Sequence, residues 1–183
     1  MYGLYKVGSF TNPYLKDINH NKDIDLICIV KEENVKNVAI NCRDHFLNSF
    51  SNKNKLHLDF KWASSKVKVL LPFCYQLYYA ELVDGEEIKE FRDQYLNVLN
   101  YSDEHFNEEI SVYFKQFNNI FHRYPYKLYM FLMNYYIRRN KSFELNQDQI
   151  ENVRYIYNCK NKDNFIEEKY QNILNTLINI WGK

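Results

Sequence analysis

The stretch that decides the fold is Asp23-Ile24-Asp25-Leu26-Ile27-Cys28-Ile29-Val30, in which two acids lead into five consecutive apolar residues. A continuous β-branched run of this length is typical of a strand that is buried on both of its faces. We therefore expect residues 24–30 to form a central strand of a sheet, with the two acids at the end where the strand opens.

The first half of the chain alternates between strand and helix patterns around this run. Residues 4–8 predict a short strand, and residues 33–50 carry apolar side chains three and four apart, which predicts an amphipathic helix. Residues 56–62 alternate apolar and polar side chains, as half-buried strands do. The segment 66–79 fits two elements, because its first part is strand-like, whereas a helix can run over 72–82.

From residue 86 onward the hydrophobic periodicity is helical. Ser102, which two acids follow, is a predicted N-cap, and Pro125 is expected in the first turn of a later helix. The sequence therefore predicts an α+β fold: a small mixed sheet with flanking helices over residues 1–85, followed by a helical C-terminal region over residues 86–183 that packs on it. The segments with helical periodicity are 88–99, 102–121, 125–139, 146–157 and 165–181.

Length and charge exclude several classes of protein. The 183 residues have a mass of 22.4 kDa, which suits one compact domain. Lys and Arg number 24 and Asp and Glu number 23, and the net charge of +1 excludes a polybasic nucleic-acid coat and an acidic tail but leaves a local basic groove open. Only four glycines are present, which leaves little room for a glycine-rich nucleotide loop.

The cysteines and the apolar runs indicate the compartment. None of the four cysteines belongs to a Cys-x-x-Cys pair, so we interpret them as small core residues in a reducing environment rather than as zinc ligands or disulfides. The sequence has no signal-peptide pattern and no run of 18 apolar residues. We therefore expect a cytoplasmic protein without a membrane segment. The cysteines are Cys28, Cys42, Cys74 and Cys159.

Aromatic residues are unusually frequent, with 17 tyrosines and 13 phenylalanines. A surface that stacks on bases needs aromatic and basic side chains in one place, and in the sequence both kinds are spread along the whole chain. We therefore interpret the aromatic stripe over residues 126–136 as core packing. His122 and Arg123, in a predicted turn between helices, are interpreted as ordinary surface residues, and the basic helix end Arg138-Arg139 as favourable charge on a helix dipole.

The two acids at the start of the central strand are candidate metal ligands. Residues two apart in a strand point to the same side, about 6.6–6.8 Å apart along the chain, so Asp23 and Asp25 share one face. Converging carboxylates suit hard divalent cations, and shared carboxylates bridge the ions in two-metal phosphoryl transfer. Asp59, on the polar face of residues 56–62 with His57 and Lys61, joins them if its strand pairs beside residues 24–30.

Two glycine-containing segments bear on the site. Gly8 precedes Ser9 at the end of the first strand, and a glycine there lets the backbone turn tightly and approach a ligand. Asn12-Pro13 then predicts a helix start, whose free N–H groups would face the phosphates of a nucleotide. Asp84, which Gly85 follows, is a competing candidate for the third acid of the site.

This arrangement resembles the DNA polymerase beta-like nucleotidyltransferase superfamily. Its signature is an apolar residue, Gly-Ser or Gly-Gly, a gap, and Asp-x-Asp opening a strand, with a third acid on a later strand. The matching residues are Val7-Gly8-Ser9, Asp23-Ile24-Asp25 and Asp59, and thirteen residues separate Ser9 from Asp23. The resemblance covers about residues 1–85, and in size the chain is similar to the small viral and prokaryotic members.

The resemblance implies both an activity and its cofactor. It implies transfer of a nucleoside monophosphate from an NTP to an acceptor hydroxyl on RNA, protein or a small molecule, with release of pyrophosphate. It also implies that Asp23 and Asp25 bind two Mg²⁺ (or Mn²⁺) ions, and that Asp59 binds one of them and assists the acceptor hydroxyl.

The resemblance further implies that Gly8 and Ser9 hold the nucleotide phosphates. Residues 10–22 lack the Arg- and Gly-rich character of minimal bacterial members, which leaves Lys16, Lys22 or Lys61 as the cations that bind phosphate.

Two other functions compete with this interpretation. One is a non-catalytic, nucleotidyltransferase-fold binding protein, such as an antitoxin-like partner. The superfamily usually has a helix before the Gly-Ser strand, whereas the given sequence starts almost at the strand, which favours this alternative. The other is a glycosyltransferase with a metal-binding Asp-x-Asp, which is weaker because there the acids usually follow a strand.

Overall fold

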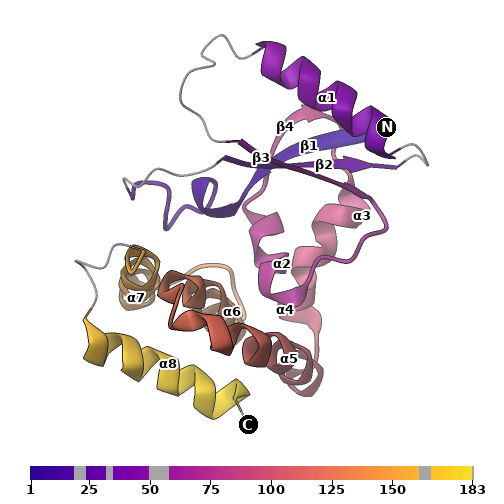
Figure 1. Ribbon diagram of the computed structural model, residues 1–183. Coiled ribbons are helices and arrows are strands. Elements are labelled where there is room, and N and C mark those ends of the chain that lie inside the picture. The colour runs from indigo at the N-terminus through magenta and orange to yellow at the C-terminus, as the bar shows by residue number, and fades with distance from the viewer. Residues whose placement is uncertain (19–23, 32–34, 50–57, 161–165, 183) are drawn as a thin grey trace. The chain divides into compact units, whose positions relative to one another are not determined.

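The computed structural model describes residues 1–18, 24–31, 35–49, 58–160 and 166–182, and it is an α+β structure with a four-stranded mixed sheet (Figure 1). The chain divides into two compact units. The sheet unit comprises Met1–Val69 and Gln76–Tyr95, and the helical unit comprises Leu70–Tyr75 and Leu96–Lys183.

The sheet has the strand order β3-β2-β1-β4. Strand β2 lies between an antiparallel neighbour, β1, and a parallel neighbour, β3, so the predicted central strand over residues 24–30 is confirmed. β4 pairs antiparallel with β1 at the other edge. The strands are β1 (Tyr2–Val7), β2 (Ile24–Val30), β3 (Leu58–Ser64) and β4 (Glu81–Gly85).

Both faces of the sheet are covered by helices. Alternate side chains of each strand point to opposite faces, so each face carries apolar side chains that a helix can bury. Helix α1 (Val35–Ser49) covers one face, and the other face carries the C-terminal part of α2 (Leu71–Tyr78) and the short helix α3 (Lys89–Arg92) (Figure 1). The core under α1 includes Leu4, Leu26, Cys28, Val30, Ala39 and Cys42. The core on the opposite face includes Tyr5, Ile29, Leu77, Ala80, Ile88 and Phe91.

Two segments differ from the sequence-based expectation. Helix α2 ends at Tyr78 instead of continuing to Leu82, because Glu81–Gly85 pairs with β1 as β4. Residues 67–70 form no strand. The side-chain amide of Gln94 takes the place of a partner strand, since it accepts from Val69 N at 2.8 Å and donates to Val67 O at 3.1 Å.

The helical unit is built around α6, which is buried nearly all round. Such a helix is apolar on every side because neighbours cover each side. The predicted core role of the stripe over residues 126–136 is confirmed for Tyr129, Phe131, Leu132 and Tyr136, all of which are buried. The helices of this unit are α4 (Asn97–Asn100), α5 (Asp103–Phe121), α6 (Leu128–Asn140), α7 (Gln147–Asn158) and α8 (Glu167–Trp181).

Local signals set the ends of these helices. Ser102 accepts a hydrogen bond from His105 N, which confirms the predicted N-cap of α5. Asn146 and Gln149 form a capping box at the start of α7. The 3₁₀ turn η3 (Pro125–Lys127) leads into α6, with Pro125 in its first turn as expected.

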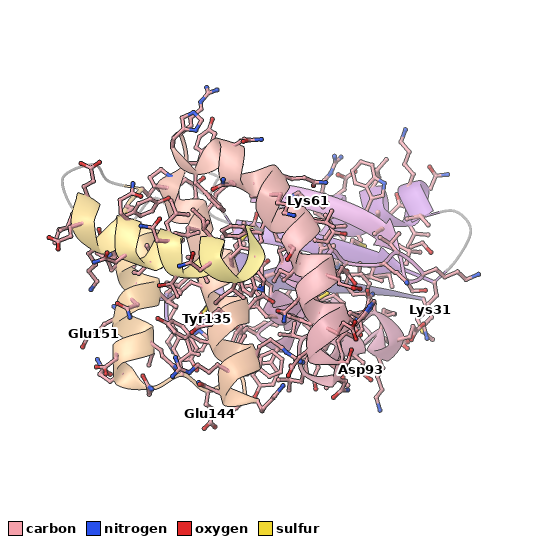
Figure 2. The ribbon with its side chains drawn as sticks, turned by 90° about the horizontal axis from the view of Figure 1, so that it is seen from below. Lys31, Lys61, Asp93, Tyr135, Glu144 and Glu151 are labelled. Carbon is pink, nitrogen blue, oxygen red and sulfur yellow. The ribbon has the colours of Figure 1, made fainter. Side chains whose placement is uncertain are left out.

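Trp181 closes the core of the helical unit from the end of the chain. The centroid of its ring lies 5.9 Å from that of Phe114 and 6.4 Å from that of Phe131, and its Nε1 donates a hydrogen bond to Asn107 Oδ1 at 3.0 Å. The ring centroid of Tyr135, which Figure 2 labels, lies 6.3 Å from that of Trp181.

Among the helices that the structure describes, none combines the length and the apolar character needed to cross a membrane.

Candidate functional site

The register of β2 and β3 brings two carboxylates together. The strands run parallel, with Asp25 directly opposite Asp59. Register partners of adjacent strands point to the same face and lie about 4.8 Å apart in the hydrogen-bonding direction. The pairing on which the expectation for Asp59 depended is therefore present, and both acids are the second residue of their strand.

Gly8 lies directly against one of these carboxylates. Val7, the last residue of β1, is the register partner of Asp25, so the chain leaves the sheet at this acid. Gly8 has φ +83°, and a Cβ placed on it would lie 2.5 Å from Asp25 Oδ2. Only glycine combines this left-handed backbone with so close an approach. The glycine is therefore required at this position, and its backbone is in contact with the acid.

The turn after Gly8 holds Ser9 beside the same strand end. Gly8–Phe10 forms the 3₁₀ turn η1, and Ser9 is half-buried in it. The carbonyl of Gly8 accepts from Thr11 Oγ1 and from Asn12 N, both at 3.3 Å. These bonds fold the backbone back over the end of β1 and keep Ser9 next to Gly8.

The prediction that a helix begins at Asn12-Pro13 is wrong. Residues 13–17 form a run of turns, in which Asn12 Oδ1 accepts from Tyr14 N at 2.9 Å and Asn12 O accepts from Leu15 N and Lys16 N. The asparagine side chain satisfies the local N–H group in an Asx turn, and residues 13–18, the described part of this segment, form no regular helix. The expected contribution of a helix N-terminus to phosphate binding therefore does not apply here.

Lys61 is the cation nearest to the two acids along β3. Figure 2 labels Lys61. Its Nζ lies 3.1 Å from Asp59 Oδ2, and the two side chains are 67% and 45% exposed, respectively. An ion pair in such solvent contact contributes little to stability. The ammonium group can therefore leave the carboxylate for another anion at small cost.

Asp84, the competing acid, lies on the other face of the sheet. It is the register partner of Leu4, which belongs to the core under α1. The hydroxyl of Tyr2 donates to Asp84 Oδ2 at 2.8 Å, and this hydrogen bond raises the pKa of Tyr2 to about 12. Asp84 is therefore engaged in a structural contact, away from Asp25 and Asp59.

Three residues named from the sequence lie outside the described ranges: Asp23, Lys22 and His57. Within those ranges no group of three His, Cys, Asp or Glu side chains is placed to hold a metal ion. The described site consists of Gly8, Ser9, Asp25, Asp59 and Lys61, at the end of the sheet where β2 and β3 begin.

The basic end of α6 separates into an inward and an outward arginine. Arg138 is buried, and its Nη1 donates to the carbonyls of Val98, Leu99 and Tyr101 at 3.1, 2.9 and 3.0 Å. Its Nη2 bonds to the Asp103 carboxylate. The interpretation of Arg138 as favourable charge on a helix dipole missed this role, although its spacing of seven from the buried Phe131 places both on one helix face.

No family model matches the chain, and no curated protein or solved structure shows significant similarity to it.

Proposed function

We propose that the protein is a metal-dependent nucleotidyltransferase, which moves a nucleoside monophosphate from an NTP to an acceptor hydroxyl and releases pyrophosphate. The observation that carries the proposal is the parallel register of Asp25 and Asp59, with Gly8 packed against the Asp25 carboxylate. The resemblance of the Gly8-Ser9 and Asp23-Ile24-Asp25 segments to the superfamily signature supports it.

The residues present fit a hard divalent cation. Asp25 and Asp59 would hold Mg²⁺ or Mn²⁺, because carboxylate oxygens from adjacent strands on one face are the ligands that these ions prefer. The resemblance adds Asp23 as a further ligand. When bound, the ion would neutralise charge on the phosphates and on the attacking oxygen.

The protein's own groups supply the remaining chemistry. The Gly8 backbone packs against the Asp25 carboxylate at the strand end, and the Ser9 hydroxyl and the Lys61 ammonium are donors for the oxygens of a phosphate bound there. The acceptor oxygen forms a bond to the α-phosphorus while the bond to pyrophosphate breaks. Asp59 takes the proton of the acceptor hydroxyl as general base.

Label transfer tests the proposal. The protein is incubated with each NTP labelled at the α-phosphate, Mg²⁺ or Mn²⁺, and separate RNA, protein and small-molecule fractions. We expect one fraction to acquire the α-label, and no fraction to acquire label from the γ-position. Binding of NTP without any labelled product would instead indicate the non-catalytic alternative.

Asp25→Asn is the decisive variant for this assay. It should abolish transfer and leave the fold intact, because like charges on facing strand positions repel and neutralising one of them relieves about 0.2–1 kcal/mol. Thermal melts in EDTA check the fold. Asp44→Asn, an equivalent change at an exposed position of α1, is the matched control and should remain active. Full activity of Asp25→Asn would disprove the catalytic role of this residue.

A further inference from the structure

The helical unit gathers basic and aromatic side chains from residues 123–127 and from Lys160. Tyr124 is 36% exposed, and the guanidinium of Arg123 and the ammonium of Lys127 lie 5.3 and 5.2 Å from its ring centroid. Tyr126 packs edge-on at 6.4 Å from Tyr124. The ammonium of Lys160, two residues after the end of α7, lies 5.8 Å from the centroid of the Tyr126 ring. We call these five residues the Tyr124 cluster.

The cations of the Tyr124 cluster have tyrosine rings, and no carboxylates, as close partners in the part of the chain that the structure describes. Within the ranges that the structure describes, none of the three forms an ion pair with a carboxylate, and each is held instead near a tyrosine ring. Lys6, Lys31 and Arg92, by contrast, are each paired with a glutamate. Among the described residues the cluster therefore gathers three positive charges without a carboxylate partner, although the net charge of the chain is only +1.

We propose that the Tyr124 cluster binds single-stranded nucleic acid. Exposed aromatic rings stack on unpaired bases of any sequence, and neighbouring Lys and Arg contact the phosphates. A duplex keeps its bases stacked on one another, so it would engage only the cations. An acidic peptide would likewise leave the tyrosine rings unused. The combination of ring and charge at one place therefore favours a single strand over both.

Strand binding by the Tyr124 cluster can be tested separately from the nucleotidyl transfer proposed for the sheet unit. It belongs to the helical unit, whereas Asp25 and Asp59 belong to the sheet unit. Binding is measured in EDTA and without NTP, so that no turnover contributes, and Asp25→Asn should bind as the wild type does. Loss of transfer and loss of strand binding are thus separate results, and either proposal can fail alone.

Fluorescence anisotropy of the full chain with labelled oligonucleotides tests the proposal. Twelve-nucleotide uridine and deoxythymidine strands should bind, and a twelve-base-pair duplex should bind more weakly. If the three cations each contact one phosphate, the logarithm of the affinity should fall with the logarithm of salt with a slope of about −2, that is about −0.7 per contact. Equal binding of the duplex, or displacement of the strand by polyglutamate at equal charge concentration, would overturn it.

Matched variants separate stacking from charge. Tyr124→Ala should weaken binding of the single strand about fivefold or more, whereas Tyr124→Phe, which keeps the ring, should bind like the wild type. Lys127→Gln should reduce the magnitude of the salt slope by about 0.7. Lys115→Gln removes one exposed charge from α5 without touching the cluster and should leave the slope unchanged. Unchanged binding by Tyr124→Ala, with an unaltered melting temperature, would refute the assignment.

Discussion

At the scale of single residues, the missing side chain of Gly8 determines how close the backbone can come to Asp25. The carboxylate fills the space that a Cβ would need, and the positive φ of Gly8 turns the chain at that point. Any larger residue at this position would adopt a strained backbone conformation and would also clash with the Asp25 carboxylate. The two effects act on different parts of the structure and can be measured apart.

Gly8→Ala is expected to destabilise the protein by about 1–2 kcal/mol through its left-handed backbone alone, and by more because the new methyl group displaces the Asp25 carboxylate. Urea unfolding measures the total. In the Asp25→Ala background the contact is relieved, so that Gly8→Ala should cost only the backbone contribution, and the double-mutant cycle gives the difference. Equal costs in the two backgrounds would show that the side-chain contact is unimportant.

The sequence identifies the acids of the candidate site, but it does not determine which of them lie next to one another in the structure. The spacing of Asp23 and Asp25 on a strongly apolar strand identifies the segment, and alternation places Asp59 on a polar strand face. Which acid lies beside Asp25 depends on strand register, which is a long-range property. The choice between Asp59 and Asp84 therefore needed the structure, which pairs Asp59 with Asp25 and bonds Asp84 to Tyr2.

At the scale of elements, predictability follows the strength of the hydrophobic period. α1, α5, α7 and α8 have clear amphipathic patterns, and β2 has a continuous apolar run, so all five were expected. β4 was not, because it is an edge strand whose Leu82 and Val83 are largely exposed and give no alternation. Residues 67–70 are strand-like in composition, yet they form no strand, and the Gln94 side chain bonds the N–H of Val69 and the carbonyl of Val67.

The connection between α4 and α5 depends on one side chain of α6. Arg138→Ala would leave the carbonyls of Val98, Leu99 and Tyr101 without this donor. We expect a loss of about 1–3 kcal/mol, because the bond to Val98 is buried and a buried group left unpaired costs about that much, whereas the other two bonds are only part-buried. Chemical denaturation measures it. Arg139→Ala, at the exposed neighbouring position, should change stability by less than about 0.5 kcal/mol. Similar effects at the two positions would contradict the buried role of Arg138.

Asp103, at the first turn of α5, makes part of the stability dependent on pH. Hydrogen bonds from Lys141 and Arg138 lower its pKa below the ordinary value. A carboxylate with a lowered folded-state pKa stabilises the fold above its unfolded pKa, about 3.9, and this contribution is lost as the pH falls through the lower folded value. In Asp103→Asn the decline of unfolding free energy below about pH 4 should be shallower. Glu104→Gln, an equivalent change at the exposed neighbouring position, is the matched control and should retain the wild-type slope.

At the scale of the whole molecule, the two units do not follow the chain in simple order. Residues 86–95 have helical periodicity, yet they belong to the sheet unit. Ile88 and Phe91 are buried in the core of the sheet face opposite α1, and Tyr5 Oη accepts from Ile88 N at 2.6 Å. The strand β1 is therefore tied to a segment more than 80 residues later.

This arrangement predicts how shortened chains behave. A chain ending at Gly85 lacks Ile88 and Phe91 and leaves the Tyr5 hydroxyl without its donor, so we expect it to be insoluble or molten. A chain ending at Tyr95 keeps these contacts and should give a better-dispersed amide spectrum and a cooperative melt. A well-dispersed spectrum from the shorter chain would contradict the prediction.

The two tryptophans of the chain fall one in each unit and in opposite environments. Trp62 on β3 is 45% exposed, and Trp181 at the end of α8 is 1% exposed. Light emission from an indole in water is shifted to the red and is quenched by acrylamide, whereas a buried indole emits further to the blue and is shielded. In a fluorescence emission spectrum excited at 295 nm, the long-wavelength side therefore reports on Trp62 and the sheet unit, and the short-wavelength side reports on Trp181 and the helical unit.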